Sequence, residues 1–207
     1  MELIQDWKSQ LLVVIIGIDG SGKTTTGKLL AERLQSQNVS SVYAKLLSNE
    51  SSFVTYYKTL LAEDKTFVDS GDIQNYVFAF ERHRTSNHEL QRLLEENSVV
   101  IVDRYVHCDI AYSNARGRSS SVFEHLLDLV PTPQLGVLMD LDAESAIKRI
   151  QNRDVPVWEF QENMDLLART RQEYLALAEQ YGFMAIDANR TSEDIVAALA
   201  NEVNDRL

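Results

Sequence analysis

The chain has 207 residues, enough for one well-filled α/β domain but too few for two ordinary ones. Hydrophobic residues make up 44% and charged residues 25%, as in most soluble globular proteins. The formal net charge of −11 argues against a nucleic-acid polymer as a partner, because phosphate backbones attract basic surfaces. Cys108 is the only cysteine, which excludes an internal disulfide and argues against a cysteine-based zinc site.

The beginning of the sequence does not read as a targeting segment. The first ten residues include Glu2 and Asp6, which do not suit a signal peptide. The apolar run at 11–16 is far too short to cross a bilayer. Only 3 prolines and 8 glycines are present, and no stretch reads as a long linker. We therefore expect a single soluble domain located in the cytoplasm.

Apolar runs and helical periodicities alternate along the chain. Residues 11–16 form a β-branched apolar run that ends at Gly17, as expected for a strand buried on both faces. Residues 22–35 follow with three leucines at helical spacing, and the last predicted helix has Thr191 or Ser192 as its N-cap. The whole pattern predicts strands at 11–16, 41–46, 98–103, 135–141 and 183–187, and helices at 22–35, 72–96, 143–152, 161–181 and 192–203.

Strands that alternate with helices predict a parallel sheet covered by helices on both faces. In such sheets, ligands bind at the carboxyl ends of the strands. Gly17, Asp103 and the loop after Asp187 all fall at that edge. We therefore expect a three-layer α/β fold with five parallel strands and a binding site at this edge.

A phosphate-binding motif directly follows the first strand. Residues 17–24 read Gly-Ile-Asp-Gly-Ser-Gly-Lys-Thr and match the P-loop pattern G-x-x-x-x-G-K-[ST] at every fixed position. Glycines let the backbone curl so that N–H groups point at phosphate oxygens, and the following helix adds its positive dipole end. Lys23 is expected to bridge the β- and γ-phosphates of ATP, and the Thr24 hydroxyl to bind Mg²⁺. The predicted ATP-binding residues are Gly17, Asp19, Gly20, Ser21, Gly22, Lys23, Thr24 and Thr25.

The third apolar strand ends on Asp103, where the second acidic element of a P-loop site belongs. Asp103 is expected to hold Mg²⁺, directly or through water. Arg104 follows directly, and its guanidinium can bind an acceptor phosphate bidentately. The alternative is an arginine that faces solvent in a loop. An arginine on an acceptor favours a kinase over a P-loop ATPase or GTPase, and the sequence contains no Asn-Lys-x-Asp element for guanine.

Further motifs follow the P-loop at ordered intervals. They are Phe-Ala-Phe-Glu-Arg at 78–82, Asp-Arg-Tyr at 103–105 followed by Ala-Tyr at 111–112, the segment 169–178, and Ile-Asp-Ala at 186–188. Together with the P-loop, this set resembles the thymidylate kinase family of nucleoside monophosphate kinases over most of the chain. The resemblance implies a P-loop fold, ATP and Mg²⁺ as donor and cofactor, and a homodimer. It also implies in-line transfer of the γ-phosphoryl group of ATP to a nucleoside monophosphate, dTMP above all.

The resemblance assigns roles on the acceptor side. Asp19 is similar to the carboxylate that contacts the 3′-hydroxyl of the acceptor sugar. Phe78 and Arg82, which share one helical face, resemble a ring that stacks on the base and a guanidinium that meets the base edge or the phosphate. Without the resemblance, Phe78 would be interpreted as a core residue. Arg104 resembles the arginine on the acceptor phosphate. Two aromatic walls of the nucleoside pocket are implied at Tyr105 and Tyr112.

Residues near 149–160 lie where the family has a mobile lid. Ser21 stands where some members carry an arginine in the P-loop, so a catalytic arginine is expected from the lid instead. Arg153 is the candidate for closing over the transferring phosphoryl group or packing on adenine. Alternatively, Arg149 and Arg153 only interact with carbonyls and acids at the end of their helix. The predicted catalytic residues are Lys23, Arg104 and Arg153.

Several positions depart from the family pattern, all on the acceptor and lid sides. Lys45 takes the place of an arginine as an acceptor-binding candidate, and the loop at 45–50 has neither the proline nor the paired glycines that usually follow. Ser113 stands where a base-reading glutamine is common, Cys108 where serine or asparagine is, and 157–158 lack an acid–arginine pair. Two alternatives therefore stay open: a divergent kinase for another nucleotide or nucleoside, and a nucleotide-binding protein without turnover.

Overall fold

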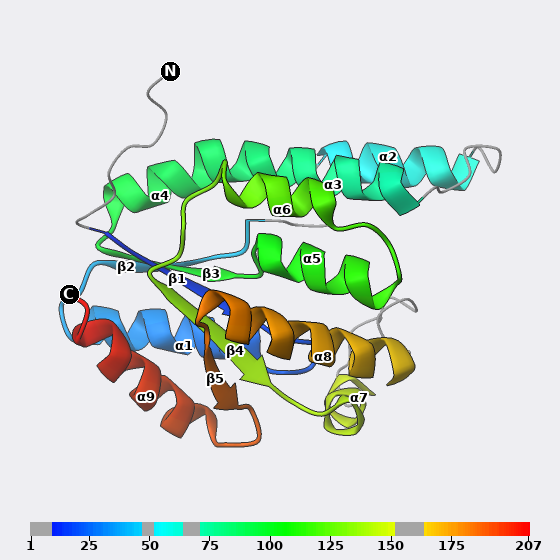
Figure 1. Cartoon of the computed structure of the whole chain (residues 1–207). Helices are drawn as coiled ribbons and strands as arrows, with labels where there is room; N and C mark the ends of the chain where they lie inside the picture. The colour runs from blue at the N-terminus through cyan, green and yellow to red at the C-terminus, as the bar shows by residue number, and fades with distance from the viewer. Residues whose placement is uncertain (1–9, 47–51, 64–70, 152–163) are drawn as a thin grey trace.

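A five-stranded parallel sheet forms the centre of the structure (Figure 1). The computed structural model describes residues 10–46, 52–63, 71–151 and 164–207. The strands lie in the order β2-β3-β1-β4-β5. Their bounds are Leu11–Ile16 for β1, Ser41–Ala44 for β2, Val99–Asp103 for β3, Leu135–Asp140 for β4 and Met184–Asp187 for β5. The predicted α/β fold, with five parallel strands in a P-loop arrangement, is confirmed.

The pairing of β1 with β3 brings two distant parts of the chain together. β1 is buried at every position and lies between β3 and β4. Its parallel register with β3 places Ile15 beside Asp103, so both strands end at the same edge of the sheet. The loop after β1 and the carboxylate at the end of β3 therefore become neighbours, although the sequence separates them widely.

Helices cover both faces of this sheet (Figure 1). α1 (Lys23–Ser36) and α9 (Ser192–Asn204) pack together on one face. α3, α5 and α6 contact one another on the other face. None of the helices within the described ranges is both long and apolar enough to span a membrane. The remaining bounds are Ser52–Glu63 for α2, Gly71–Thr85 for α3, Val106–Ala115 for α5, Ser121–Leu127 for α6, Ala143–Gln151 for α7 and Met164–Tyr181 for α8.

The long helix predicted at 72–96 is present, but it changes its winding once. α3 runs into a π-helical segment, η1 (Ser86–Leu90), and then into α4 (Gln91–Glu96). Single π turns of this kind widen a helix locally. Both Ser86 and Leu90 are fully buried, so the wider turn faces the core.

Three helices were not expected from the sequence: α2, α5 and α6. α5 is buried along nearly its whole length. A helix that is enclosed on all sides lacks the alternation of apolar and polar positions by which helices are predicted. The helices predicted at 143–152 and 161–181 correspond to α7 and α8, and residues 152–163 lie outside the described part of the chain.

Thr191 caps α9, as one of the two predicted caps. Its side-chain oxygen accepts a hydrogen bond from the Asp194 N–H at 3.1 Å. This bond satisfies one of the N–H groups that lack a helical partner in the first turn. The cap therefore stabilises the start of α9. This helix packs against α1, which directly follows the P-loop.

Gly136 in β4 is predicted to be intolerant of any side chain. A Cβ at this position would lie 2.3–2.5 Å from ring atoms of Phe183, whose other neighbours include the His107 ring at 4.7 Å between centroids. Gly136→Ala should therefore destabilise the fold by about 1–3 kcal/mol through overpacking. Urea unfolding followed by circular dichroism measures this change. The double variant Gly136→Ala/Phe183→Leu should recover part of the loss, and an unchanged midpoint for Gly136→Ala alone would contradict the prediction.

Candidate active site

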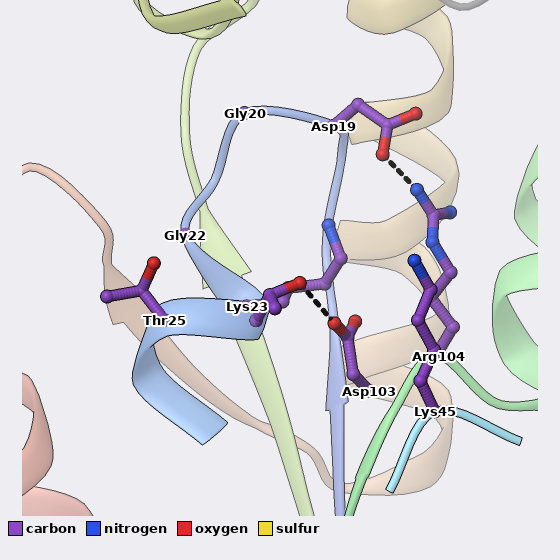
Figure 2. A pocket seen from close by; sticks show the side chains of 9 residues that line it. Asp19, Gly20, Gly22, Lys23, Thr25, Lys45, Asp103 and Arg104 are labelled. Atoms are coloured by element: carbon purple, nitrogen blue, oxygen red, sulfur yellow. Dashed lines mark hydrogen bonds and ion pairs between the residues drawn. The ribbon is translucent and has the colours of Figure 1, made fainter. Parts of the chain in front are cut away.

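A polar cavity of about 330 Å³ lies where β1 ends and α1 begins (Figure 2). Donor-side and acceptor-side candidates line it together, as expected from the edge of a parallel sheet. The structure thus brings together most of the residues predicted from the P-loop and from the end of β3. The lining residues are Asp19, Gly20, Gly22, Lys23, Thr24, Thr25, Lys45, Asp103 and Arg104.

The P-loop backbone has positive φ angles at several glycines, Gly20 and Gly22 among them. Gly20 has a φ of 87°, and a Cβ there would lie 2.7 Å from the Ala146 carbonyl oxygen. Gly22 has a φ of 94° and is the N-cap of α1. Only glycine adopts such angles without strain. The positive end of α1 therefore opens onto the cavity, where its first N–H groups and its dipole favour an anion.

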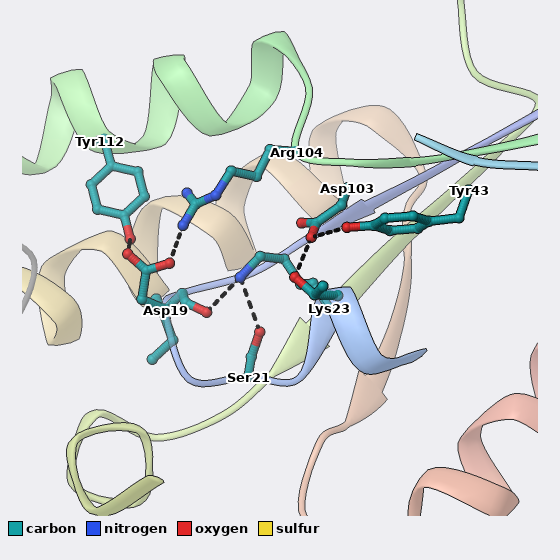
Figure 3. Close-up of polar contacts among 9 residues, drawn as sticks. Asp19, Ser21, Lys23, Tyr43, Asp103, Arg104 and Tyr112 are labelled. Atoms are coloured by element: carbon teal, nitrogen blue, oxygen red, sulfur yellow. Dashed lines mark hydrogen bonds and ion pairs between the residues drawn. The ribbon is translucent and has the colours of Figure 1, made fainter. Parts of the chain in front are cut away.

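Lys23 lies inside the curve of the loop (Figure 3). Its Nζ donates to the Ile18 carbonyl at 2.8 Å and to Ser21 Oγ at 3.4 Å, and the residue is only 5% exposed. Burial lowers the pKa of this ammonium and Arg104 lowers it further, while Asp19 and Asp103 oppose the shift. A phosphate in the cavity would favour the charged form, because opposite charge at short range raises the pKa of an ammonium.

Thr24 and Asp103 meet at the predicted metal position. The Thr24 hydroxyl donates to Asp103 Oδ2 at 2.5 Å. Oδ2 also accepts from the Tyr43 hydroxyl at 3.0 Å, while Oδ1 is buried and has no hydrogen-bond partner among the described residues (Figure 3). Buried carboxylate oxygens are normally satisfied, so an orphaned one fits a cation ligand. Burial also raises the pKa of Tyr43 to about 12, which keeps its hydroxyl a donor.

Arg104 forms an ion pair with Asp19 across the mouth of the loop (Figures 2 and 3). The Tyr112 hydroxyl donates to the other oxygen of Asp19 at 3.3 Å, and the guanidinium of Arg104 lies 5.8 Å from the Tyr112 ring centroid. Burial alone would raise the pKa of Asp19, but the charges of Arg104 and Lys23 outweigh it and the pKa is lowered. Asp19 is therefore an anion held between two cations.

Arg104 also has a strained backbone. Its φ is 70°, in the left-handed region that non-glycine residues rarely adopt. Its N–H donates to the Ile15 carbonyl at 3.1 Å, which continues the β1–β3 pairing by one residue. Strain of this kind persists where the surroundings over-determine it and is frequent at functional sites. The sharp turn after Asp103 places carboxylate and guanidinium side by side at the cavity.

A family comparison can now be set beside this geometry. The sequence model of the thymidylate kinase family matches residues 15–199, which contain the P-loop, Asp103 and Arg104. The chain belongs to the thymidylate kinase family. As a member of that family, it is a nucleoside monophosphate kinase that uses ATP as its phosphoryl donor.

Relatives from archaea match almost end to end. A "Probable thymidylate kinase" of Pyrococcus abyssi is 33% identical over 202 residues, which cover 92% of this chain and 96% of the relative. The "Probable thymidylate kinase" of Pyrobaculum aerophilum is 32% identical over 188 residues, with 91% and 93% covered. A "Probable thymidylate kinase 1" of Saccharolobus solfataricus is 29% identical over 187 residues, with 90% and 93% covered.

Three further residues that the thymidylate kinase pattern assigns to the acceptor, Phe78, Lys45 and Tyr105, differ in how deeply they are buried. Phe78 on α3 is partly buried and packs against the core, while Lys45 lines the cavity after β2. Tyr105 is fully buried, and its hydroxyl donates to the Pro131 carbonyl at 2.7 Å. Its ring therefore packs in the core, with the His107 ring 6.2 Å away, and does not wall the cavity next to Arg104.

Arg82 is wholly buried and forms an ion pair that the sequence did not reveal. Its Nε donates to Asp109 Oδ2 at 2.9 Å, while Nη1 has no hydrogen-bond partner in the described part of the chain. Burial raises the pKa of the Asp109 carboxyl, and the guanidinium beside it counteracts the shift. The signal available in the sequence was Asp109 itself, an acidic residue three positions before Tyr112 in a mostly apolar segment.

Of the predicted lid near 149–160, the structure describes only residues 149–151, at the end of α7. Arg149 at the end of α7 donates from Nη2 to the Ala188 carbonyl at 2.9 Å, just after β5. The carbonyl that Arg149 binds therefore lies in the loop after β5 and not at the end of its own helix, as the alternative interpretation had it. Arg153 and residues 152–160 of the predicted lid lie outside the described residues.

The Arg82–Asp109 pair yields a stability prediction. Asp109→Asn leaves a buried guanidinium without its counter-charge, which should destabilise the protein by about 3–5 kcal/mol, measured by urea unfolding at neutral pH. Glu144→Gln is the matched control, because Glu144 and its partner Lys148 are both 69% exposed, and exposed ion pairs contribute little to stability. Replacing both partners with Arg82→Met/Asp109→Leu should cost less than Asp109→Asn alone. Equal unfolding midpoints for Asp109→Asn and Glu144→Gln would contradict the prediction.

Proposed function

We propose that the chain transfers the γ-phosphoryl group of ATP to dTMP and forms dTDP and ADP. In this reaction an oxygen of the acceptor phosphate forms a bond to the γ-phosphorus while the bond to the ADP oxygen breaks. The observation that supports the proposal best is the shared cavity of Lys23, Asp103 and Arg104. Lys23 and Asp103 suffice for a triphosphate, and Arg104 adds a second anion-binding group in the same cavity.

We assign the donor phosphates to Lys23, the P-loop glycines and the positive end of α1. Lys23 would exchange its contacts with Ile18 and Ser21 for oxygens of the transferring group. Preorganised positive charge of this kind stabilises the negative charge of the transition state. Mg²⁺ would be held by Thr24 and Asp103, whose free Oδ1 suits a hard cation, and would neutralise phosphate charge when bound.

We assign the acceptor phosphate to Arg104 and the acceptor sugar to Asp19. The two residues neutralise each other in the ion pair, so an incoming phosphate would share the guanidinium with Asp19. Tyr112 supports this arrangement, since it contacts both partners of the pair. Phe78 and the free Nη1 of Arg82 are proposed to serve the base, and Lys45 to add positive charge beside the acceptor.

Further parts of the proposal rest on the family resemblance. The chain is proposed to act as a single domain with a lid near 149–160, whose Arg153 closes over the transferring group and whose closure excludes water. A homodimer in the cytoplasm is also proposed. Tyr76 and Phe80 on α3 and Tyr56 on α2 support the dimer, because each is more than half exposed and a second copy would cover them.

An acceptor panel tests the proposal. The purified protein is incubated with ATP, Mg²⁺ and each of dTMP, dUMP, dCMP, dGMP and thymidine, and both products are quantified by ion-exchange chromatography. We expect ADP and dTDP in equal amounts, with the highest kcat/KM for dTMP. Phosphorylation of thymidine alone would replace the proposal with a nucleoside kinase. ADP without a phosphorylated acceptor would indicate an ATPase, and bound ATP without ADP a binding protein without turnover.

Lys23→Ala should remove nearly all transfer activity while the fold is kept. Removal of one preorganised donor to a developing anion typically costs about a hundredfold to a thousandfold in kcat, and Lys23 is the cation inside the P-loop. Transfer is measured with the best acceptor of the panel, and folding by thermal denaturation. Arg33→Ala, on the exposed side of the same helix, serves as the charge-matched control and should keep full activity. Full activity of Lys23→Ala would overturn the assignment of the donor site.

A further inference from the structure

The Asp103 carboxylate is held from one side only. Its Oδ2 accepts two hydroxyl donors, Thr24 at 2.5 Å and Tyr43 at 3.0 Å. Figure 3 shows the contact with Tyr43. Its Oδ1 is equally buried, yet no described residue donates to it. Two donors on a single oxygen fix the rotation of a carboxylate about its Cβ–Cγ bond. The second oxygen is thereby aimed away from both hydroxyls and left for another ligand.

Tyr43 reaches Asp103 because the sheet and α1 clamp its ring. β2 pairs with β3 so that Tyr43 lies beside Ile101, two residues before Asp103 on the neighbouring strand. A Cβ on Gly27 would lie 2.7 Å from Cδ2 and 2.9 Å from Cε2 of Tyr43, so the ring lies directly against the backbone of α1. The ammonium of Lys28 lies 5.9 Å from the ring centroid. The packing of the ring against α1 therefore fixes the position of the hydroxyl, and the side chain has little freedom to move it.

We propose that Tyr43 is a positioning residue for the metal site, which holds the Asp103 carboxylate by Oδ2 so that Oδ1 is kept for Mg²⁺. Nothing in the P-loop pattern or in the family resemblance pointed to this tyrosine. The inference deepens the proposed function and rests on its assignment of Thr24 and Asp103 to the metal. Residues that orient metal ligands by hydrogen bonds typically contribute about tenfold to a hundredfold in metal affinity.

Because the Tyr43 hydroxyl also donates to Oδ2, Thr24 is not the sole donor that orients the carboxylate. If Thr24 alone held Oδ2, any rearrangement of its hydroxyl toward a cation would free the carboxylate to rotate. With Tyr43 in place, one donor remains on Oδ2 throughout. One of the two donors that orient Asp103 then comes from β2 and lies outside the P-loop, which is the part of the site that must contact nucleotide.

The purely structural alternative is that Tyr43 only fills the space above Gly27. Tyr43→Phe distinguishes the positioning role from the space-filling role, because it keeps the ring against α1 and removes only the hydroxyl that donates to Asp103. The expected result is at least tenfold weaker binding of Mn²⁺ in the presence of a non-hydrolysable ATP analogue, measured by the electron paramagnetic resonance signal of free Mn²⁺. Affinity for the analogue without metal should stay unchanged, since Tyr43 is not among the residues that line the cavity.

Tyr181→Phe is the matched control, because Tyr181 lies at the end of α8 with its ring against His107, while the hydroxyls on Asp103 Oδ2 belong to Thr24 and Tyr43. It should bind Mn²⁺ as the natural protein does. A second variant, Gly27→Ala, pushes the ring while leaving its hydroxyl intact and should weaken Mn²⁺ binding as well, with thermal denaturation reporting whether it folds. Equal Mn²⁺ affinity of Tyr43→Phe and the natural protein would overturn the inference.

The two proposals fail separately. If Tyr43→Phe weakens Mn²⁺ binding although the natural protein phosphorylates no nucleoside monophosphate, the positioning role stands and the proposed function falls. If the natural protein forms dTDP and Tyr43→Phe binds Mn²⁺ normally, the proposed function stands and the positioning role falls.

Discussion

The hydrogen bond from Thr24 to Asp103 is the contact on which the site depends. It joins the first turn of α1 to the end of β3, two elements that are adjacent only because β1 and β3 pair in parallel. A shift of one residue in that register would turn Asp103 to the opposite face of the sheet, since side chains alternate along a strand. The continuous burial of β1 and β3 fixes the register, so the hydrophobic core determines where the carboxylate meets the P-loop.

The charges around the cavity form a balanced set inside an acidic protein. Lys23 and Arg104 lower the pKa of Asp19 against the effect of burial, and burial lowers the pKa of Lys23 against the effect of Asp19 and Asp103. The free-energy cost of burying each charge is thus offset by the opposite charges beside it. An overall charge of −11 therefore does not prevent the binding of anions, because the local field is set by these few buried groups and by the end of α1.

The sequence predicted those parts of the fold that are encoded locally. Runs such as 11–16 and 99–102 are apolar at every position, and the P-loop has a spacing that few other structures share. α5 escaped prediction because its burial removes any amphipathic period. The partners of side chains were also inaccessible: Tyr43 meets Asp103 across 60 positions, and Arg82 meets Asp109 across 27. Such contacts follow from strand order and helix packing, which no local pattern contains.

The proposed donor and acceptor halves of the site are coupled electrostatically through Asp19. Its carboxylate pairs with Arg104 and also acts on Lys23, while Arg104 lowers the pKa of Lys23. Two buried cations that disfavour each other need negative charge between them, and Asp19 supplies one such charge. A phosphate that draws Arg104 away from Asp19 changes the field at Lys23 as well. Under the proposed assignment, occupation of one half therefore alters the electrostatics of the other, and both nucleotides would depend on a single carboxylate at the bend of the P-loop.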